Sequence, residues 1–203
     1  MGPLTAAQKR QKEKDKKKRQ KELDQAREEN ALHDLANGTP GQRKEAELVH
    51  ITKQLRSLNL DVVDVPADGD CLFHALAHQH GGSMTAVDMR ALLVEHIRSH
   101  SEDYIAFMEI TEGRPVTEAL EEYCASMSKS GTWGTALEVR AAADCFHTSI
   151  AMITATSVTV CGSGDTPAAS AQWSVVFYQY LYTLGSHFNA TSKRNDIVAD
   201  DDD

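Results

Sequence analysis

The chain has 203 residues, of which 41% are hydrophobic and 25% charged, and its formal net charge is −9. These values are typical of one globular domain with room for a tail, and they exclude a chain that is disordered throughout. Because no run of about 18 apolar residues occurs, we expect no membrane-spanning helix, and without an apolar stretch after the basic N-terminal residues we expect no secretory signal peptide.

The charge is unevenly distributed along the chain. Residues 1–60 contain 14 Lys or Arg and 9 Asp or Glu, whereas residues 61–203 contain 7 and 21. The acidic part is a poor match for nucleic acid, whose binding depends on neutralising phosphates, and it suits a basic protein or peptide better.

The first predicted element is a highly charged helix within residues 8–36, where strong helix formers dominate. No apolar heptad is sustained, so a stable coiled coil is not expected. Residues 37–41, Asn-Gly-Thr-Pro-Gly, should end this helix. A second helix is predicted over about 42–58, with Leu48, Ile51, Leu55 and Leu58 on one apolar face.

Helices come first in the remaining chain and strands come later. A short strand at 60–65 and a turn at 66–70 precede a buried helix at 71–77, and Thr85-x-x-Asp88 resembles a capping box that opens another helix. Further helices are predicted at 116–127 and at 135–145, where Thr135-x-x-Glu138 is a regular capping box. Strands are predicted at 148–154, 157–160, 174–181 and 187–190. This order predicts an α+β fold.

These elements suggest four segments. We expect a charged, flexible or helical N-terminal segment at 1–40, a helix leading into the domain at 41–59, a catalytic domain at 60–195 and an acidic tail at 196–203.

Two places carry candidate chemistry. The first is Cys71, which a glycine-containing turn delivers to a predicted helix N-terminus. Unpaired backbone N–H groups and the helix dipole at that position favour a thiolate, so we expect the pKa of the thiol to be lowered. The second is the segment Gly185 to Asn189, where strand alternation should point His187 and Asn189 the same way.

A cysteine set against a histidine oriented by an amide is the arrangement of cysteine proteases. On spacing alone, an alternative stays open in which Cys71 is a core residue and His187 lies at the surface of a strand end. None of the four cysteines forms a CxxC pair, so a zinc site of that type is not expected.

Three segments resemble the motifs of the ovarian-tumour (OTU) family of deubiquitinases. Residues 68–76, Asp-Gly-Asp-Cys-Leu-Phe-His-Ala-Leu, resemble its nucleophile motif, residues 133–138 its Trp-Gly-x-x-x-Glu motif, and residues 185–189 its Gly-x-His-aromatic-Asn strand. The motifs occur in the family's order, and the resemblance covers about 61–191. The charged N-terminal segment is similar to the OTU branch with a lysine-rich helix before the domain.

This resemblance implies a papain-like fold of OTU type, with helices packed on a small central, mostly antiparallel sheet. It implies that the chain is a thiol-dependent deubiquitinase that hydrolyses isopeptide bonds at the C-terminal glycine of ubiquitin through an acyl-enzyme. Cys71 would be the nucleophile, His187 the general base and then acid, and Asn189 the residue that orients His187. Asp68, which some accounts of the family count in the triad, would order the 68–71 loop.

The resemblance assigns Trp133 and Glu138 to the scaffold beside the site, with the tryptophan expected to be buried. One segment departs from the family: residues 156–173 are rich in Ser, Ala, Thr and Gly, whereas the corresponding hairpin of the family is more acidic and aromatic. This leaves the surface that would contact ubiquitin open.

No cofactor or metal is expected. His74 and His78 are four residues apart on the predicted helix, a spacing at which two histidines can bind one zinc ion. No carboxylate or third ligand accompanies them as in the H-E-x-x-H motif. Cys124, Cys145 and Cys161 are expected to be buried or inert.

Two other functions stay open. One is a non-enzymatic adaptor that binds ubiquitin while residues 8–36 contact RNA or a ribonucleoprotein, and the other is a protease of a ubiquitin-like modifier. We expect ubiquitin or polyubiquitin as partner, no membrane, and a cytoplasmic location to which the basic segment could add the nucleus. Linkage preference and oligomeric state do not follow from the sequence.

Overall fold

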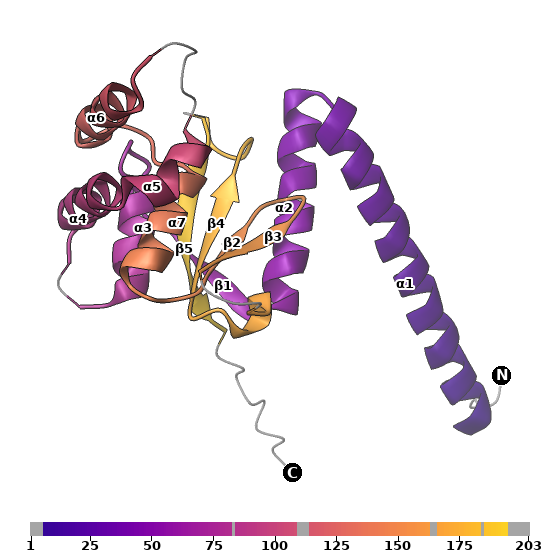
Figure 1. Cartoon of the computed structure of the whole chain (residues 1–203). Coiled ribbons are helices and arrows are strands. Elements are labelled where there is room, and N and C mark those ends of the chain that lie inside the picture. The colour runs from indigo at the N-terminus through magenta and orange to yellow at the C-terminus, as the bar shows by residue number, and fades with distance from the viewer. Residues whose placement is uncertain (1–5, 83, 109–113, 163–165, 184, 195–203) are drawn as a thin grey trace. The chain divides into compact units, whose positions relative to one another are not determined.

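The computed structural model describes residues 6–82, 84–108, 114–162, 166–183 and 185–194, so the predicted acidic tail at 196–203 lies outside the described residues. Internal contacts divide the chain into two units, Met1–His50 and Ile51–Asp203 (Figure 1). None of the described helices is both long enough and apolar enough to cross a membrane.

The first unit contains helix α1 (Ala6–Asn37) and the beginning of helix α2 (Pro40–Ser57). The break that the sequence predicts at 37–41 is confirmed, and it is short. Gly38 N–H donates to Asp34 O at 2.9 Å, and Thr39 N–H donates to Gln42 Oε1 at 3.0 Å while Gln42 N–H donates back to Thr39 Oγ1 at 3.4 Å. Thr39-x-x-Gln42 is therefore a capping box, a signal that the sequence analysis overlooked.

The second unit is built on one five-stranded sheet in the order β1-β5-β4-β2-β3. The strands are β1 (Leu60–Val63), β2 (Ile150–Ile153), β3 (Val158–Cys161), β4 (Trp173–Tyr178) and β5 (His187–Lys193). Only the β2–β4 pair is parallel among these neighbours, and the other three pairs are antiparallel. The predicted α+β fold with a mostly antiparallel sheet is confirmed.

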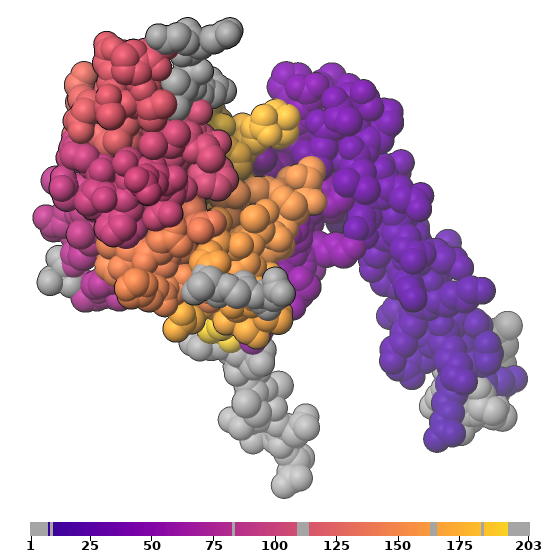
Figure 2. Space-filling model, in the orientation of Figure 1, coloured from indigo at the N-terminus to yellow at the C-terminus, as the bar shows by residue number. Residues whose placement is uncertain are grey.

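Four longer helices accompany the sheet: α3 (Cys71–His80), α4 (Ala86–Ser99), α6 (Val116–Met127) and α7 (Ala136–Cys145). The short helices α5 (Ser101–Tyr104), η1 (Ile105–Phe107) and η2 (Ala168–Ser170) were not predicted. Both predicted capping boxes are present, at Thr85 and Thr135. Helix α4 packs against α6, and Figure 2 shows the outer surface that these two helices form.

The core lies on both sides of the sheet because successive strand residues point to opposite faces. Val175, Phe188 and Ala190 pack among α3, α4, α6 and α7. Val176 packs instead with Ile51 of α2 on the other face. The predicted apolar face of the second helix is confirmed for Ile51 and Leu55, whereas Leu48 is 38% exposed. Helix α3 lies directly against β5, and this contact brings the two candidate segments, 71 and 187–189, together.

Candidate active site

Cys71 is the first residue of α3, as the sequence predicts, and it is 8% exposed. Burial raises the pKa of the Cys71 thiol, against the opposing effect of hydrogen bonds from the backbone of Phe188 and Leu72, and the negative charge of Asp68 raises it further. The expectation that the helix N-terminus lowers this pKa is therefore wrong. A thiol so well removed from water loses the solvation that would stabilise its charged form, so deprotonation must be coupled to a nearby base.

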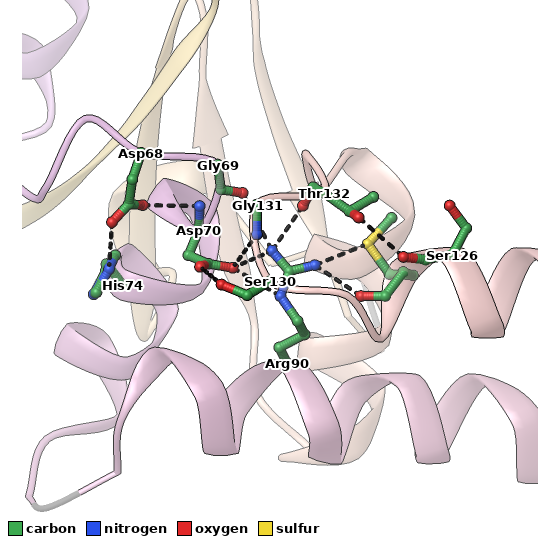
Figure 3. A network of polar contacts seen from close by, with 10 residues as sticks. Asp68, Gly69, Asp70, His74, Arg90, Ser126, Ser130, Gly131 and Thr132 are labelled. Atoms are coloured by element: carbon green, nitrogen blue, oxygen red, sulfur yellow. Dashed lines mark hydrogen bonds and ion pairs between the residues drawn. The ribbon is translucent and has the colours of Figure 1, made fainter.

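Asp68 lies in the loop before α3, and its carboxylate binds within that loop. Oδ1 accepts the Asp70 backbone N–H at 2.8 Å, and Oδ2 lies 3.3 Å from His74 Nε2. The Cys71 N–H also donates to the Asp68 carbonyl at 3.3 Å. Asp68 therefore binds two backbone positions of the loop before α3 (Figure 3), while its role in catalysis stays a prediction.

A buried arginine that the sequence analysis did not single out holds the same loop from its other side. Arg90 of α4 is 3% exposed; its Nε donates to Asp70 Oδ1 at 2.8 Å and its Nη2 to the Gly69 carbonyl at 3.2 Å. The guanidinium also donates to the carbonyls of Met127 and Thr132, at 2.8 and 2.7 Å (Figure 3). Arg90 therefore connects the loop at residues 68–71, called the cysteine loop below, to the segment that leads to Trp133.

His187 begins β5 and is 3% exposed. Its Nε2 lies 2.9 Å from Asn189 Oδ1, so the two side chains share a side of the strand as predicted. Burial lowers the pKa of the His187 imidazole below its ordinary value, although the Asn189 bond and the charges of Asp64 and Asp68 act in the opposite direction. The ring is therefore neutral at pH 7 and can accept a proton.

Cys71 and His187 are carried by α3 and β5, which are in contact. Among the described residues, no hydrogen bond joins the Cys71 thiol to the His187 ring. The link between them is the Phe188 backbone, which follows His187 and hydrogen-bonds the thiol. A catalytic pair of this kind often tightens only when substrate binds. The arrangement can therefore support proton transfer from the thiol to the ring, directly or through one water.

A surface pocket of about 180 Å³ joins the three motif segments. It is lined by Ala67, Asp68, Gly69, Trp133, Tyr182, Gly185, Ser186 and His187. Trp133 is 52% exposed, so the expectation that it is buried is wrong. It stands at the wall of this pocket because Gly185 offers no side chain there: a Cβ on Gly185 would lie 2.6 Å from Trp133 Cη2.

Glu138 has the scaffold position that was expected for it. It is fully buried, and one carboxylate oxygen accepts the Thr135 N–H at 2.7 Å, which closes the capping box of α7. The other oxygen accepts a hydrogen bond from the Tyr123 hydroxyl. Burial together with this carboxylate raises the pKa of Tyr123 far above its ordinary value, so the phenol stays a donor.

The remaining histidines and cysteines contribute no metal site that the described residues reveal. His74 contacts Asp68, and among the described residues no three His, Cys, Asp or Glu side chains are grouped to hold an ion. Cys124 is buried, while Cys145 and Cys161 are partly buried rather than fully so. Burial raises the pKa of all three thiols.

Close packing at Gly69 leads to a testable prediction. A Cβ at this position would lie 2.1 Å from the Gly131 carbonyl oxygen, so the two loops that Arg90 joins would have to separate. We expect Gly69→Ala to lower the free energy of unfolding by about 1–3 kcal/mol, as overpacking does, measured by urea denaturation. Gly41→Ala is the control, because a Cβ there meets nothing within 4 Å, and equal stability of the two variants would contradict the prediction.

Comparison with known proteins agrees with this geometry. The chain is 27% identical over 203 residues to human "Deubiquitinase OTUD6B", covering 97% of this chain and 66% of that protein. It is 25% identical to "Ubiquitin thioesterase otu2" of Schizosaccharomyces pombe, covering 75% and 52%. The chain thus spans between about half and two thirds of the length of these relatives.

A solved structure, "Structure of OTUD1 OTU domain", matches with a TM-score of 0.55 at 18% identity and covers 73% of this chain and 96% of that one. This likeness shows that the fold is shared. The family model described as "OTU-like cysteine protease" matches residues 66–188, which include the first two motifs and the third as far as Phe188. Because this match extends over more than half of the sequence, the chain belongs to the OTU-like cysteine protease family.

Proposed function

We propose that this chain is a deubiquitinase, a cysteine hydrolase of isopeptide bonds at the C-terminal glycine of ubiquitin. The observation that carries the proposal is the pocket in which the cysteine loop, Trp133 and His187 meet, with His187 held by Asn189. The names of the human and fission-yeast relatives, a deubiquitinase and a ubiquitin thioesterase, support this substrate class.

The proposed reaction has two half-reactions. The proton of the Cys71 thiol moves to His187 Nδ1, and the sulfur attacks the carbonyl of the terminal glycine. His187 then gives the proton to the leaving lysine amine, and the C–N bond breaks to leave a thioester. Water, deprotonated by the same imidazole, hydrolyses the thioester and restores the thiol.

Backbone N–H groups near Cys71 would stabilise the negative oxygen of the intermediate. The Asp70 N–H is engaged by the Asp68 carboxylate and the Cys71 N–H donates to the Asp68 carbonyl at 3.3 Å, which leaves this stabilisation to the amides that follow in α3. Asp68 itself cannot bind an oxyanion, because its carboxylate is an acceptor. Its proposed role is to hold the loop in shape.

Substrate selection follows from the pocket and the charge. The pocket of about 180 Å³, with Trp133 at its wall, would receive the C-terminal glycines of the ubiquitin tail. The excess of acidic residues in 61–203, 21 against 7 basic, would attract the arginines in the tail of ubiquitin.

A panel of di-ubiquitins of every linkage, with ubiquitin-like conjugates beside them, tests the proposal on the wild-type chain. We expect cleavage of at least one di-ubiquitin and covalent labelling by a ubiquitin C-terminal electrophile. Cleavage of a ubiquitin-like conjugate alone would move the substrate to that modifier. Binding of ubiquitin without labelling or cleavage would support an adaptor instead.

A second role is proposed for the basic part of α1. Residues 8–21 contain nine basic and two acidic residues on a helix whose described side chains there are exposed. Such a helix suits an RNA or ribonucleoprotein partner. We expect the full chain to retain RNA at low salt, and Lys16, Lys17 and Lys18 changed together to glutamine to weaken retention and flatten its salt dependence. Unchanged retention by this triple variant would exclude this helix as the contact.

A further inference from the structure

Asn189 is the centre of a hydrogen-bond network that extends beyond His187. It is fully buried, and its Nδ2 donates to Asp64 Oδ1 at 2.9 Å and to Tyr182 Oη at 2.7 Å. Its Oδ1 lies 2.9 Å from His187 Nε2 and accepts the Val65 backbone N–H at 3.0 Å. Both ends of the amide are therefore fully engaged.

These contacts determine the protonation of the His187 ring. A backbone N–H can only donate, so the atom of Asn189 that faces Val65 must be the oxygen. That same oxygen can only accept from His187, and Nε2 must therefore carry the hydrogen. The lone pair of the neutral ring is left on Nδ1, the nitrogen available to receive a proton from a thiol.

Asp64 adds a negative charge to this network. It follows the end of β1, and its carboxylate accepts from Asn189 and also from the hydroxyl of Tyr182. Burial raises the pKa of Tyr182, and the Asp64 charge adds to that effect, so this hydroxyl stays protonated as a donor. The Tyr182 and His187 rings lie 4.2 Å apart between centroids.

The charge of Asp64 acts differently on the two reacting groups. It raises the pKa of His187, whereas the acidic residue that raises the pKa of Cys71 is Asp68. Asp64 thus favours the imidazolium form of His187. The Val65 N–H would orient Asn189 without help, so the distinct contribution of Asp64 is its charge.

We propose that Asp64, acting through Asn189 and together with Tyr182, is a positioning residue that stabilises the protonated form of His187. The inference rests on the proposed function, since it assigns Asp64 to the same proton transfer. No local pattern marks the residue, because Asp64 and Asn189 are 125 positions apart.

Two substitutions separate charge from hydrogen bonding. Asp64→Asn keeps an acceptor oxygen and removes the charge, and Asp64→Ala removes both. Asp61→Asn is the matched control: Asp61 lies three residues earlier, within β1, and its carboxylate pairs with Arg194 instead.

The first measurement is the rate at which iodoacetamide alkylates Cys71, followed by mass spectrometry of the Cys71 peptide across pH. We expect Asp64→Ala to slow alkylation about tenfold at neutral pH, the effect of one pKa unit on the thiolate–imidazolium pair. Asp64→Asn should slow it by less, and Asp61→Asn should leave it unchanged. In di-ubiquitin cleavage, kcat should fall with KM preserved, because Asp64 does not line the substrate pocket.

The second measurement is the histidine ring NMR spectrum in a Cys71→Ala background. We expect the Nε2–H tautomer of His187 in the parent and a lower imidazole pKa after Asp64→Asn. Folding of each variant is checked by thermal denaturation, and Asp64→Asn, nearly identical in shape, keeps the test valid if Asp64→Ala unfolds.

The outcomes distinguish the two proposals, since neither alkylation nor NMR uses ubiquitin. If wild type cleaves no ubiquitin substrate but Asp64→Asn still lowers the pKa of His187 and slows alkylation, the inference holds and the proposed function fails. If wild type cleaves di-ubiquitin while Asp64→Asn and Asp64→Ala change neither readout, the inference is overturned and the function stands.

Discussion

Replacing Cys71 with alanine should abolish cleavage of di-ubiquitin, with a loss of at least about 10⁴-fold in kcat, as for removal of a nucleophile in a catalytic triad. Among the described cysteines, Cys71 is the one that directly follows the loop whose residues 67–69 line the pocket. His187 can still activate water in this variant, but no acyl-enzyme can form. Labelling by a ubiquitin C-terminal electrophile, followed by intact-mass spectrometry, is the direct measurement.

Cys161→Ala is the control, because Cys161 is a partly buried cysteine and burial raises the pKa of its thiol as well. It should label and cleave like wild type. Thermal denaturation should show that Cys71→Ala remains folded, since the change removes only one sulfur at the end of a helix. Labelling that persists in Cys71→Ala would falsify the assignment of the nucleophile.

Replacing Arg90 with methionine should lower the free energy of unfolding at neutral pH by about 3–5 kcal/mol, the usual effect of removing one partner of a buried ion pair. Arg90 is 3% exposed, and its loss would leave the Asp70 carboxylate and the Gly69 and Thr132 carbonyls without this donor (Figure 3). The guanidinium also lies 3.9 Å from the centre of the Phe73 ring. Urea denaturation measures the change.

The pH dependence of this effect has a defined sign. Burial alone would raise the pKa of Asp70, but hydrogen bonds from Ser130, Arg90 and the Gly131 N–H outweigh it and hold the pKa below its ordinary value. A carboxyl group with a lowered folded pKa contributes stability above its unfolded pKa of about 3.9, and loses that contribution as pH falls through the folded value. The stability difference between wild type and Arg90→Met should therefore shrink below about pH 4.

Two further variants test the interpretation. Arg98→Met changes a half-exposed arginine of the same helix, which pairs with the exposed Glu95 and Glu121, and should cost no more than about 1 kcal/mol. Arg90→Met combined with Asp70→Asn should be more stable than Arg90→Met alone, because no buried charge is then unpaired. If Arg90→Met is as stable as Arg98→Met, the network does not hold the cysteine loop.

Local patterns predicted most of the secondary structure. The capping boxes at Thr85 and Thr135 fixed the starts of α4 and α7, because each signal lies within four residues. The alternation of β5 placed His187 and Asn189 together, since their separation of two residues is local to one strand. The short helices α5, η1 and η2 were missed, because segments this short do not show the helical periodicity of apolar residues.

The residues that support the site could not be found in this way. Arg90 is 20 residues from Asp70 and 42 from Thr132, and nothing in its own helix distinguishes it from Arg98. The pKa of Cys71 was predicted in the wrong direction because sequence reveals the helix N-terminus but not the burial of the thiol. Trp133 was expected to be buried, yet it is 52% exposed, because the sequence does not reveal how far a side chain is covered by distant segments.

The sequence by itself determined the three motifs, their order, the α+β element pattern and the division of charge between residues 1–60 and 61–203, because each of these is a local or additive property of the chain. Only the tertiary structure decided which distant groups meet: Arg90 with the cysteine loop, and Asp64 with Asn189. Burial and long-range hydrogen bonding depend on packing of the whole core, and these two quantities govern the protonation of Cys71 and His187.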